Sequence, residues 1–296
     1  MQNFRLKVFL TVAKRLSFTK AAKELYISQP AVTKHIVALE QHFNTKLFVR
    51  RGSTIELTEA GKLLQQLGTK IDHIYSLLDF ELGILKDEHK GKLIIGASTT
   101  MTQYVIPPLM ARFHQKFKDI VIHMVNGNTE QIEAALKRNE IDLGIIEGFS
   151  KRQNFKYIEF LKDEIVLVAK SDHPLTKKGE ITLEELQVQP LLLREKGSGT
   201  LEVIEHYLKQ LGHSLADFNV EMHFGSTEGI KNYILNSNSL AFLSVQSILK
   251  ELTRNELSIV DVTGTDFKRR FNFILNDGDN NPLSQLFIRF ALKYNF

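Results

Sequence analysis

The sequence predicts an N-terminal all-α helix-turn-helix with a β-hairpin wing and a long following helix, and then a two-lobed α/β domain. Three observations support this fold class. Two short amphipathic segments meet at a tight break within residues 18–43, apolar residues recur at heptad spacing over residues 64–85, and strand-like and helix-like segments alternate after Gly91. At 296 residues, the chain is long enough for about two or three domains.

The composition limits the classes of protein that the chain can represent. It is 43% hydrophobic and 24% charged, as globular proteins are, and no apolar run approaches the roughly 20 residues that span a bilayer. The N-terminus is amphipathic and shows no secretory signal pattern, so we expect a cytoplasmic protein without a membrane partner. The absence of cysteine excludes disulfides, thiolate nucleophiles and Cys-zinc sites.

Positive charge is concentrated in the first 60 residues. They contain 10 Lys and Arg against 4 Asp and Glu, whereas the remaining residues contain 28 against 30. A solvated helical surface would explain this excess by itself. A surface that binds phosphate groups would explain it as well, and it would also account for the helix-turn-helix in the same segment.

The helix-turn-helix is predicted from apolar spacing and turn chemistry. Residues 4–14 form a first helix that braces the next two, because their apolar side chains recur at helical spacing. In the pair itself, Ser28 is expected to N-cap the second helix, with Pro30 in its first turn. This helix buries Val32, Ile36 and Leu39 and exposes Gln29, Thr33, Lys34 and His35. The pattern indicates a helix that reads DNA.

A short hairpin, the wing, is predicted over residues 46–58, where β-branched and apolar residues flank Gly52 and Ser53. Arg50 and Arg51 stand at its tip. They are either an ordinary pair of loop charges or a contact to phosphates and the minor groove.

A long linker helix follows from Thr58, which can cap it. Its apolar seam consists of Leu64, Leu67, Ile71, Ile74, Leu78, Leu82 and Leu85. Such a seam can pack on its own domain or pair two chains. We favour dimerisation, because a DNA reader gains from presenting two recognition helices about one turn of DNA apart.

The α/β domain is predicted from alternating segments after Gly91. Strands are expected at residues 92–99, 120–128, 141–148, 163–171, 220–224, 240–244, 257–262 and 269–276, with helices between them and a last helix from Pro282. Two lobes with a cleft between them account for this series most economically.

Hydroxyl-rich segments stand where two strands lead into helices. Ser98, Thr99 and Thr100 follow the first strand, and Gly197, Ser198, Gly199 and Thr200 open a helix of the other lobe. Ordinary helix capping would explain either segment alone. Together they predict a small-anion site, because helix N-termini present N–H groups and a positive dipole end. Asn128, Thr129, Glu147 and Thr227 are expected to line the same crevice.

No catalytic or metal motif accompanies these segments. The histidines lack HExxH spacing, and neither a GxSxG elbow nor a P-loop is present, so we expect no enzyme, cofactor or metal. The rival hypothesis is that the α/β half is a stand-alone solute binder or an enzyme, and that the N-terminal part is an interaction module.

The motifs also resemble those of LysR-type transcriptional regulators from end to end. The resemblance rests on FTKAAKELYISQPAVTKHIxxLE at 18–40, LFxR at 47–50 and LTEAG at 57–61. It implies a winged helix-turn-helix at 1–58, a dimerising linker helix at 59–88, and an effector domain like the type 2 periplasmic binding proteins. Effector lobe 1 would comprise 91–161 and 268–296, and lobe 2 would comprise 163–265.

The resemblance also implies residue roles and partners. Gln29, Pro30, Thr33 and Lys34 match positions that read bases, and Lys20, Ser28, His35, Arg50 and Arg51 match positions that contact phosphate or form the wing. The implied partners are double-stranded DNA, a homodimer or homotetramer, and a small anionic metabolite, with RNA polymerase as a further candidate.

Within the family, the strings IGASTT, GNTEQI, LGIIEG and REKGSGT resemble most the branch associated with cysteine biosynthesis and carbon dioxide fixation. That branch implies an anionic co-inducer such as a sulfur compound or a sugar phosphate. Leu201 stands where an arginine is common in the branch, and Arg194 is the candidate to replace its charge.

Overall fold

The computed structural model describes the chain except residues 1–3, 52–53, 85–89, 150, 280 and 295–296. The chain divides into two compact units, an N-terminal unit of Met1–Gly91 and a C-terminal unit of Lys92–Phe296. Among the described residues, no helix combines the length and apolar character needed to cross a bilayer.

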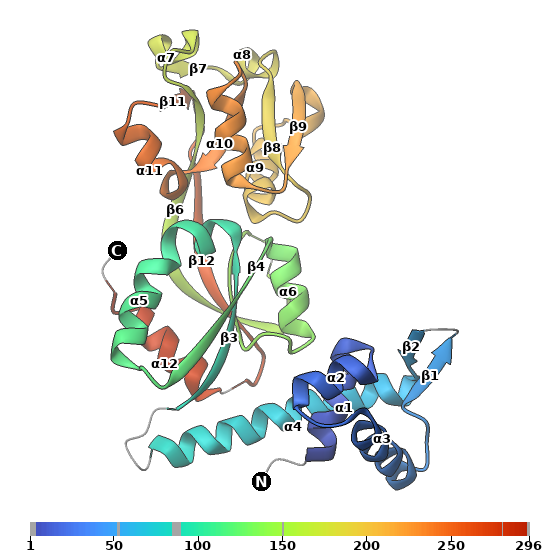
Figure 1. The fold of residues 1–296 in the computed structure, drawn as a ribbon. Helices are drawn as coiled ribbons and strands as arrows, with labels where there is room; N and C mark the ends of the chain where they lie inside the picture. Colours follow the sequence, from blue (N-terminus) through green and yellow to red (C-terminus); the bar gives the residue numbers. More distant parts are fainter. Residues whose placement is uncertain (1–3, 52–53, 85–89, 150, 280, 295–296) are drawn as a thin grey trace. The chain divides into compact units, whose positions relative to one another are not determined.

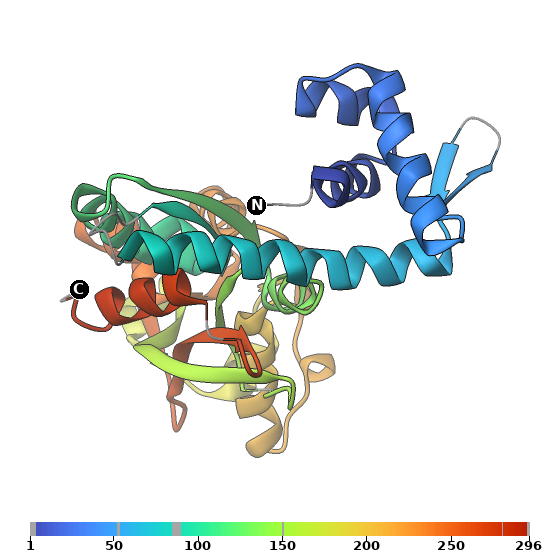
Figure 2. The same ribbon diagram turned by 90° about the horizontal axis from the view of Figure 1, so that it is seen from below.

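The N-terminal unit is a winged helix-turn-helix followed by one long helix (Figure 2). Its elements are α1 (Phe4–Arg15), α2 (Phe18–Leu25), α3 (Gln29–Phe43), β1 (Phe48–Arg51), β2 (Thr54–Leu57) and α4 (Glu59–Ile84). The strands β1 and β2 pair antiparallel, which confirms the predicted wing. Val8, Phe9 and Val12 of α1 are fully buried and form the centre of its core.

Local capping fixes the end of α2 and both ends of α3. The Oγ atom of Ser28 accepts a hydrogen bond from the Ala31 amide at 3.3 Å, so the predicted N-cap of α3 is confirmed. Tyr26 and Asn44 end α2 and α3 in the left-handed region, with φ of 55° and 48°. Asparagine adopts the left-handed region more readily than an aromatic residue such as Tyr26, so Asn44 suits its position well.

The C-terminal end of α3 is tied to the start of α4. Glu40 is 9% exposed, and it accepts hydrogen bonds from the Leu47 amide at 2.9 Å and from Lys46 Nζ at 2.7 Å. Burial raises the pKa of Glu40, but these hydrogen bonds outweigh it and leave the pKa below its ordinary value. The Leu47 carbonyl in turn accepts from the Thr58 amide at 3.0 Å. A Cβ atom on Gly61 would lie 2.1 Å from that carbonyl oxygen, so only glycine lets α4 start this close.

The C-terminal unit contains two lobes built on one continuous sheet (Figure 1). Lobe 1 contains β3 (Gly91–Ser98), η1 (Met101–Val105), α5 (Ile106–Lys116), β4 (Ile120–Gly127), α6 (Thr129–Lys137), β5 (Leu143–Glu147) and α12 (Pro282–Ala291). Lobe 2 contains α7 (Pro174–Lys178), β7 (Glu180–Ile181), α8 (Leu183–Gln187), β8 (Leu191–Arg194), α9 (Gly199–Gln210), η2 (Leu215–Asp217), β9 (Val220–Phe224), α10 (Thr227–Leu235), β10 (Leu240–Ser244), α11 (Val245–Thr253) and β11 (Leu257–Val262).

Two long antiparallel strands, β6 (Phe155–Lys170) and β12 (Phe267–Asn276), run through both lobes. The main strand order is β4-β3-β5-β12-β6-β10-β8-β9, so these two strands join the lobes. The start of the strand predicted over residues 163–171 was wrong, because β6 begins at Phe155. Its first half alternates charged and apolar residues only irregularly, which hid it from the sequence reading.

Helices cover both faces of the sheet in each lobe. In lobe 1, Phe273 of β12 faces Phe287 of α12, while the next residue, Ile274, packs with Ile132 of α6 on the other face. In lobe 2, adjacent strand residues likewise divide between two cores, one with α8 and α9 and the other with α10 and α11. This arrangement confirms the predicted two-lobed α/β architecture.

Candidate functional site

The outer face of α3 carries the predicted base-reading residues. Gln29, Pro30, Thr33 and Lys34 are all exposed. Gln29 Nε2 donates to Thr33 Oγ1 at 3.4 Å, and Thr33 Oγ1 donates to the Gln29 carbonyl at 3.2 Å. The two side chains lie one helical turn apart on the same exposed face.

The predicted phosphate contacts lie in different environments. Lys20 and Ser28 are exposed, and Ser28 Oγ is engaged by its cap. His35 is half-buried, with its ring 5.2 Å from that of Phe4 in an edge-on contact. The backbone of Arg50 and Arg51 lies at the end of the wing, paired with Ile55 and Thr54, but their side chains fall outside the description.

The linker seam changes character along α4. Leu64 packs against the helix-turn-helix core, and Gly68 lets α1 approach, since a Cβ there would lie 2.8 Å from Leu6 Cδ1. After Leu64, the seam residues whose side chains are described are open to solvent: Leu67, Ile71, Ile74 and Leu78 are 47%, 44%, 60% and 50% exposed. The side chain of Leu82 and all of Leu85 lie outside the described residues. An unpaired row of this length on one helix is typical of a surface that meets another chain.

The predicted hydroxyl groups of the α/β unit are buried between the lobes. Ser98, Thr99 and Thr100 are 1%, 6% and 2% exposed, and Ser198 and Thr200 are 4% and 3% exposed. Ser198 Oγ caps α9 by accepting from the Thr200 amide at 3.3 Å.

The helix after β3 departs from the predicted cap. The side chain of Thr100 makes no capping bond; instead Ser98 Oγ accepts from the Met101 amide at 3.5 Å. The first turns form the π-helix η1 before α5 begins, and Pro107 and Pro108, which lack N–H donors, lie just inside α5. Short π-helical turns of this kind occur often at functional sites.

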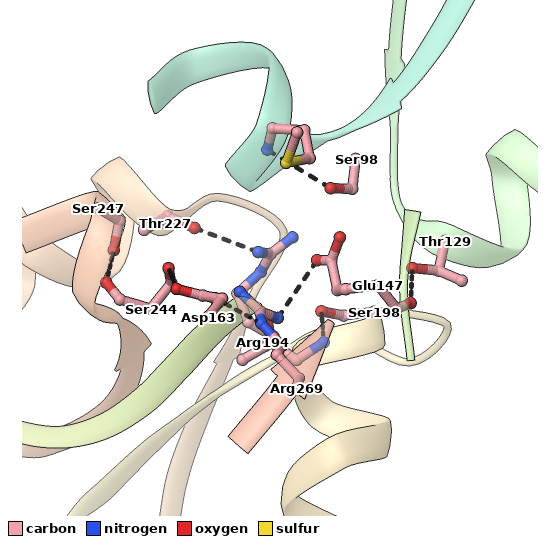
Figure 3. A network of polar contacts seen from close by, with 12 residues as sticks. Ser98, Thr129, Glu147, Asp163, Arg194, Ser198, Thr227, Ser244, Ser247 and Arg269 are labelled. Carbon is pink, nitrogen blue, oxygen red and sulfur yellow. Dashed lines mark hydrogen bonds and ion pairs between the residues drawn. The ribbon is translucent and has the colours of Figure 1, made fainter. Parts of the chain in front are cut away.

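A buried arginine that the sequence reading overlooked organises the space between the lobes (Figure 3). Arg269 of β12 donates from Nε to Asp163 Oδ2 at 2.7 Å and from Nη1 to Thr200 Oγ1 at 2.8 Å. Its Nη1 also lies 3.5 Å from Glu147 Oε1. On the other side of Asp163, Oδ1 accepts from Ser244 Oγ at 2.8 Å. Arg269 therefore connects β6 and β12, the crossover strands that join the lobes, to Glu147 of lobe 1 and Thr200 of lobe 2.

A second buried arginine, Arg194, stands at the end of β8. It is 3% exposed, and its Nη1 donates to Thr227 Oγ1 at 3.1 Å. Its Nε and Nη2 donate to the two carboxylate oxygens of Glu195 at 2.8 and 3.0 Å. We call these residues the interlobe cluster: Ser98, Thr129, Glu147, Asp163, Arg194, Glu195, Ser198, Thr200, Thr227, Ser244 and Arg269.

Direct hydrogen bonds bridge the lobes on both sides of the interlobe cluster. On one side, Asn128 Nδ2 donates to Glu195 Oε1 at 3.2 Å, and the Glu130 amide donates to the Gly197 carbonyl at 3.2 Å. On the other side, Tyr104 OH donates to Glu228 Oε1 at 2.5 Å. Burial and this hydrogen bond to Glu228 raise the pKa of Tyr104, which therefore stays a donor.

Gly199 brings the two lobes into close contact. A Cβ atom at this position would lie 2.3 Å from the Glu147 carbonyl oxygen and 2.6 Å from Thr129 Oγ1. Thr129 Oγ1 itself donates to the Glu147 carbonyl at 2.9 Å. The start of α9 thus lies directly on the end of β5, with the Glu147 side chain beside it.

The structure brings five of the eleven predicted effector residues into one group of contacts. Thr129, Glu147, Ser198, Gly199 and Thr200 are in mutual contact or linked by one residue. Asn128 serves mainly as the cap of α6, where it completes a capping box with Gln131, and it bonds across to Glu195.

The sequence reading missed Asp163, Arg269 and Ser244. The signal that could have identified them is a charged residue at an inward-facing position of a strand. Asp163 and Arg269 are such residues, and they lie opposite each other in the β6–β12 register. Register could not be deduced from sequence for strands more than one hundred residues apart, so the pairing was hidden.

Two family profiles match the chain. The profile described as "Bacterial regulatory helix-turn-helix protein, lysR family" matches residues 4–62. The profile described as "LysR substrate binding domain" matches residues 86–295.

Curated relatives extend over nearly the whole chain. The HTH-type transcriptional regulator CysL of Bacillus subtilis (strain 168) is 32% identical over 293 residues, which cover 98% of this chain and 96% of CysL. A probable RuBisCO transcriptional regulator of Porphyra purpurea is 32% identical over 275 residues, covering 92% of this chain and 87% of the relative. Both names agree with the branch that the sequence motifs predicted.

Solved structures show the same architecture. A full-length OxyR variant from Pseudomonas aeruginosa superposes with a TM-score of 0.74 at 18% identity, covering 99% of this chain and 95% of OxyR, and it supports the fold alone. The CcmR regulatory domain of Synechocystis in complex with 2-PG superposes with a TM-score of 0.62 at 29% identity, covering 68% of this chain and 95% of that domain. The relatives are regulators, which decides against the rival hypothesis of an enzyme. The chain belongs to the LysR family of DNA-binding transcriptional regulators.

Proposed function

We propose that this regulator binds a small anionic metabolite at the interlobe cluster and that the metabolite controls the geometry of the DNA-reading oligomer. The single observation that carries the proposal is the burial of two arginines, Arg194 and Arg269, each of which donates to a threonine hydroxyl of lobe 2, those of Thr227 and Thr200. Buried cations and hydroxyl donors are suited to an anion, and α9 adds its N-terminal amides. The similarity to the CcmR domain in complex with 2-PG supports the same ligand class.

The proposed mechanism is a population shift. The lobes are held by hydrogen bonds such as those of Tyr104 with Glu228 and Asn128 with Glu195, and β6 and β12 join them. A ligand that contacts both lobes favours the arrangement in which both sets of contacts form. In an oligomer, the changed lobe arrangement would alter the spacing or angle of paired α3 helices on DNA.

The oligomer is proposed to be a dimer formed along the open part of the linker seam, with two dimers in a tetramer. We further propose a cytoplasmic location, RNA polymerase as a partner on the promoter, and the domain limits predicted above. The exposed heptad row on α4 supports the dimer.

The proposed division of roles on the DNA-reading surface gives one prediction. Replacing Gln29 with alanine should lower discrimination at one base step by roughly 1–3 kcal/mol, because a side chain that contacts a base edge is lost. Replacing Lys20 with alanine should weaken binding to all duplexes alike and reduce the salt dependence by about one counterion. Fluorescence anisotropy over a salt series, with a selected operator and a random duplex, measures both effects. Equal losses on the two duplexes for both variants would show that the roles are misassigned.

The proposed anion site gives a second prediction. Thr100→Val and Ser198→Ala should each weaken the binding of inorganic sulfate by about threefold to tenfold, because each removes one buried hydroxyl. Ser198→Ala also removes the cap of α9, so Thr182→Ala is the matched control: it removes the cap of α8, whose hydroxyl accepts from the Glu185 amide at 3.3 Å. Calorimetric titration of the full chain measures the affinity. An unchanged affinity in both hydroxyl variants would remove the proposed site.

A further inference from the structure

Two buried polar atoms of opposite charge in the interlobe cluster have no hydrogen-bond partner among the described residues. They are Oε2 of Glu147 and Nη2 of Arg269. Both side chains are almost fully buried, at 3% and 1% exposed. Leaving a polar atom of a charged side chain buried without a hydrogen-bond partner is costly, so each atom marks a position where a further polar group would be favourable.

The two atoms come from side chains that are in loose contact. Glu147 Oε1 lies 3.5 Å from Arg269 Nη1, beyond the usual range of a charge-assisted hydrogen bond. Arg269 is held more closely by Asp163 and Thr200, at 2.7 and 2.8 Å. Figure 3 shows the Glu147 carboxylate lying between Ser98 on one side and the two arginines and Ser198 on the other. The carboxylate is therefore central in the cluster and only weakly neutralised.

The charge balance of the interlobe cluster points the same way. Its two cations, Arg194 and Arg269, face the buried carboxylates of Glu147 and Asp163 and the partly exposed carboxylate of Glu195. A ligand with anionic groups alone would add to this excess of negative charge in a buried space. A ligand that also carries a positive group would give Glu147 a partner while its anionic group meets Arg269.

We propose that the metabolite belongs to the amino-acid class, with a protonated amine beside its anionic group. This inference rests on the proposed effector site. The amine donates to Glu147 Oε2, and the anionic group accepts from Arg269 Nη2 and from the hydroxyls of Ser98 and Ser198. Glu147 is thereby the residue that determines specificity between amine-bearing and plain anions.

In an alternative role, the Glu147 carboxylate would compete with the ligand for Arg269, and a plain anion would displace it from the guanidinium. In that case we would expect the carboxylate to engage the guanidinium with both oxygens, as bidentate pairs do. Only Oε1 approaches Arg269, and Oε2 has no partner. The geometry therefore favours Glu147 as a ligand contact.

The test compares two probes that differ in the amine, glycine and acetate, by calorimetric titration of the full chain. The wild type should bind glycine about tenfold more tightly than acetate, because a charge-assisted hydrogen bond is added. In Glu147→Gln, glycine binding should weaken by about tenfold and acetate binding should strengthen. Tighter binding of both probes to Glu147→Gln would identify Glu147 as a competitor and overturn the inference. Failure of both probes to bind the wild type would overturn it as well, since glycine carries both required groups.

Two controls make the outcome specific. Glu159→Gln removes an exposed carboxylate that pairs with Arg270 and should leave both affinities unchanged. Glu147→Asp retains the charge and should keep part of the preference for glycine. If Thr100→Val and Ser198→Ala weaken both probes while Glu147→Gln leaves their ratio unchanged, the inference fails and the proposed site stands. If the two hydroxyl variants change neither probe, the proposed site itself fails.

Discussion

Replacing Arg269 with methionine is expected to lower the free energy of unfolding of the C-terminal unit by about 3–5 kcal/mol, because it leaves buried carboxylates without a counter-ion. The guanidinium is 1% exposed, and its partners Asp163 and Glu147 are 0% and 3% exposed. Methionine has a similar volume, so loss of charge pairing rather than a cavity dominates the effect. Hydrogen exchange of peptides from β6 and β12, measured in the full chain at increasing urea concentrations, reports this free energy.

Arg270 provides a matched control on the same strand. It pairs with Glu159, but the two side chains are 55% and 47% exposed. Solvent screens such a pair, so Arg270→Met should change stability by only about 0–1 kcal/mol. Similar losses in the two methionine variants would contradict the view that the buried pair holds the crossover strands together.

Replacing Ile71 with glutamate is expected to prevent dimerisation along the linker seam and so to leave the protein monomeric. Ile71 is 44% exposed in the single chain and lies between Leu67 and Ile74 on the open apolar row. Burying a carboxylate in a dimer contact there would be costly. Because a monomer presents one reading helix, operator affinity should fall by about 10² to 10⁴-fold through lost avidity. Sedimentation equilibrium and anisotropy on the operator measure the two effects.

Gln66→Glu is the control for this substitution. Gln66 is exposed on α4 and lies off the seam, and its replacement introduces the same charge. It should leave the oligomer intact. Dimers of Ile71→Glu that persist at micromolar concentration would show that another surface holds the chains together.

The sequence was most informative where structure depends on near neighbours. Ser28 and Asn44 mark the two ends of α3 through contacts within a few residues, and the structure confirms Ser28 as the N-cap. Thr58 likewise caps α4, accepting from the Gly61 amide at 3.0 Å. Such signals are local, so a single chain suffices to interpret them.

The site was less accessible because its central contacts join distant segments. Arg269 and Asp163 meet only through the register of β6 and β12, and Arg269 also reaches Thr200 at the start of α9. Charged residues in a strand usually indicate a solvent-facing side, and here one of two consecutive arginines points inward. The hydroxyls of Ser98 and Ser198 were predicted because helix starts have a recognisable composition.

Hydrogen bonds join Glu40 of α3 to Leu47, just before the wing, and Leu47 to Thr58, just before α4, so we expect α3, the wing and α4 to turn together as one lever. Helix α4 has 26 residues, about 39 Å at 1.5 Å per residue. A rotation of about 10° around its far end would carry the reading helix through roughly 7 Å, about two base-pair steps of 3.4 Å each. A small change of angle at one end of the lever would therefore suffice to move a reading helix from one set of base pairs to the next.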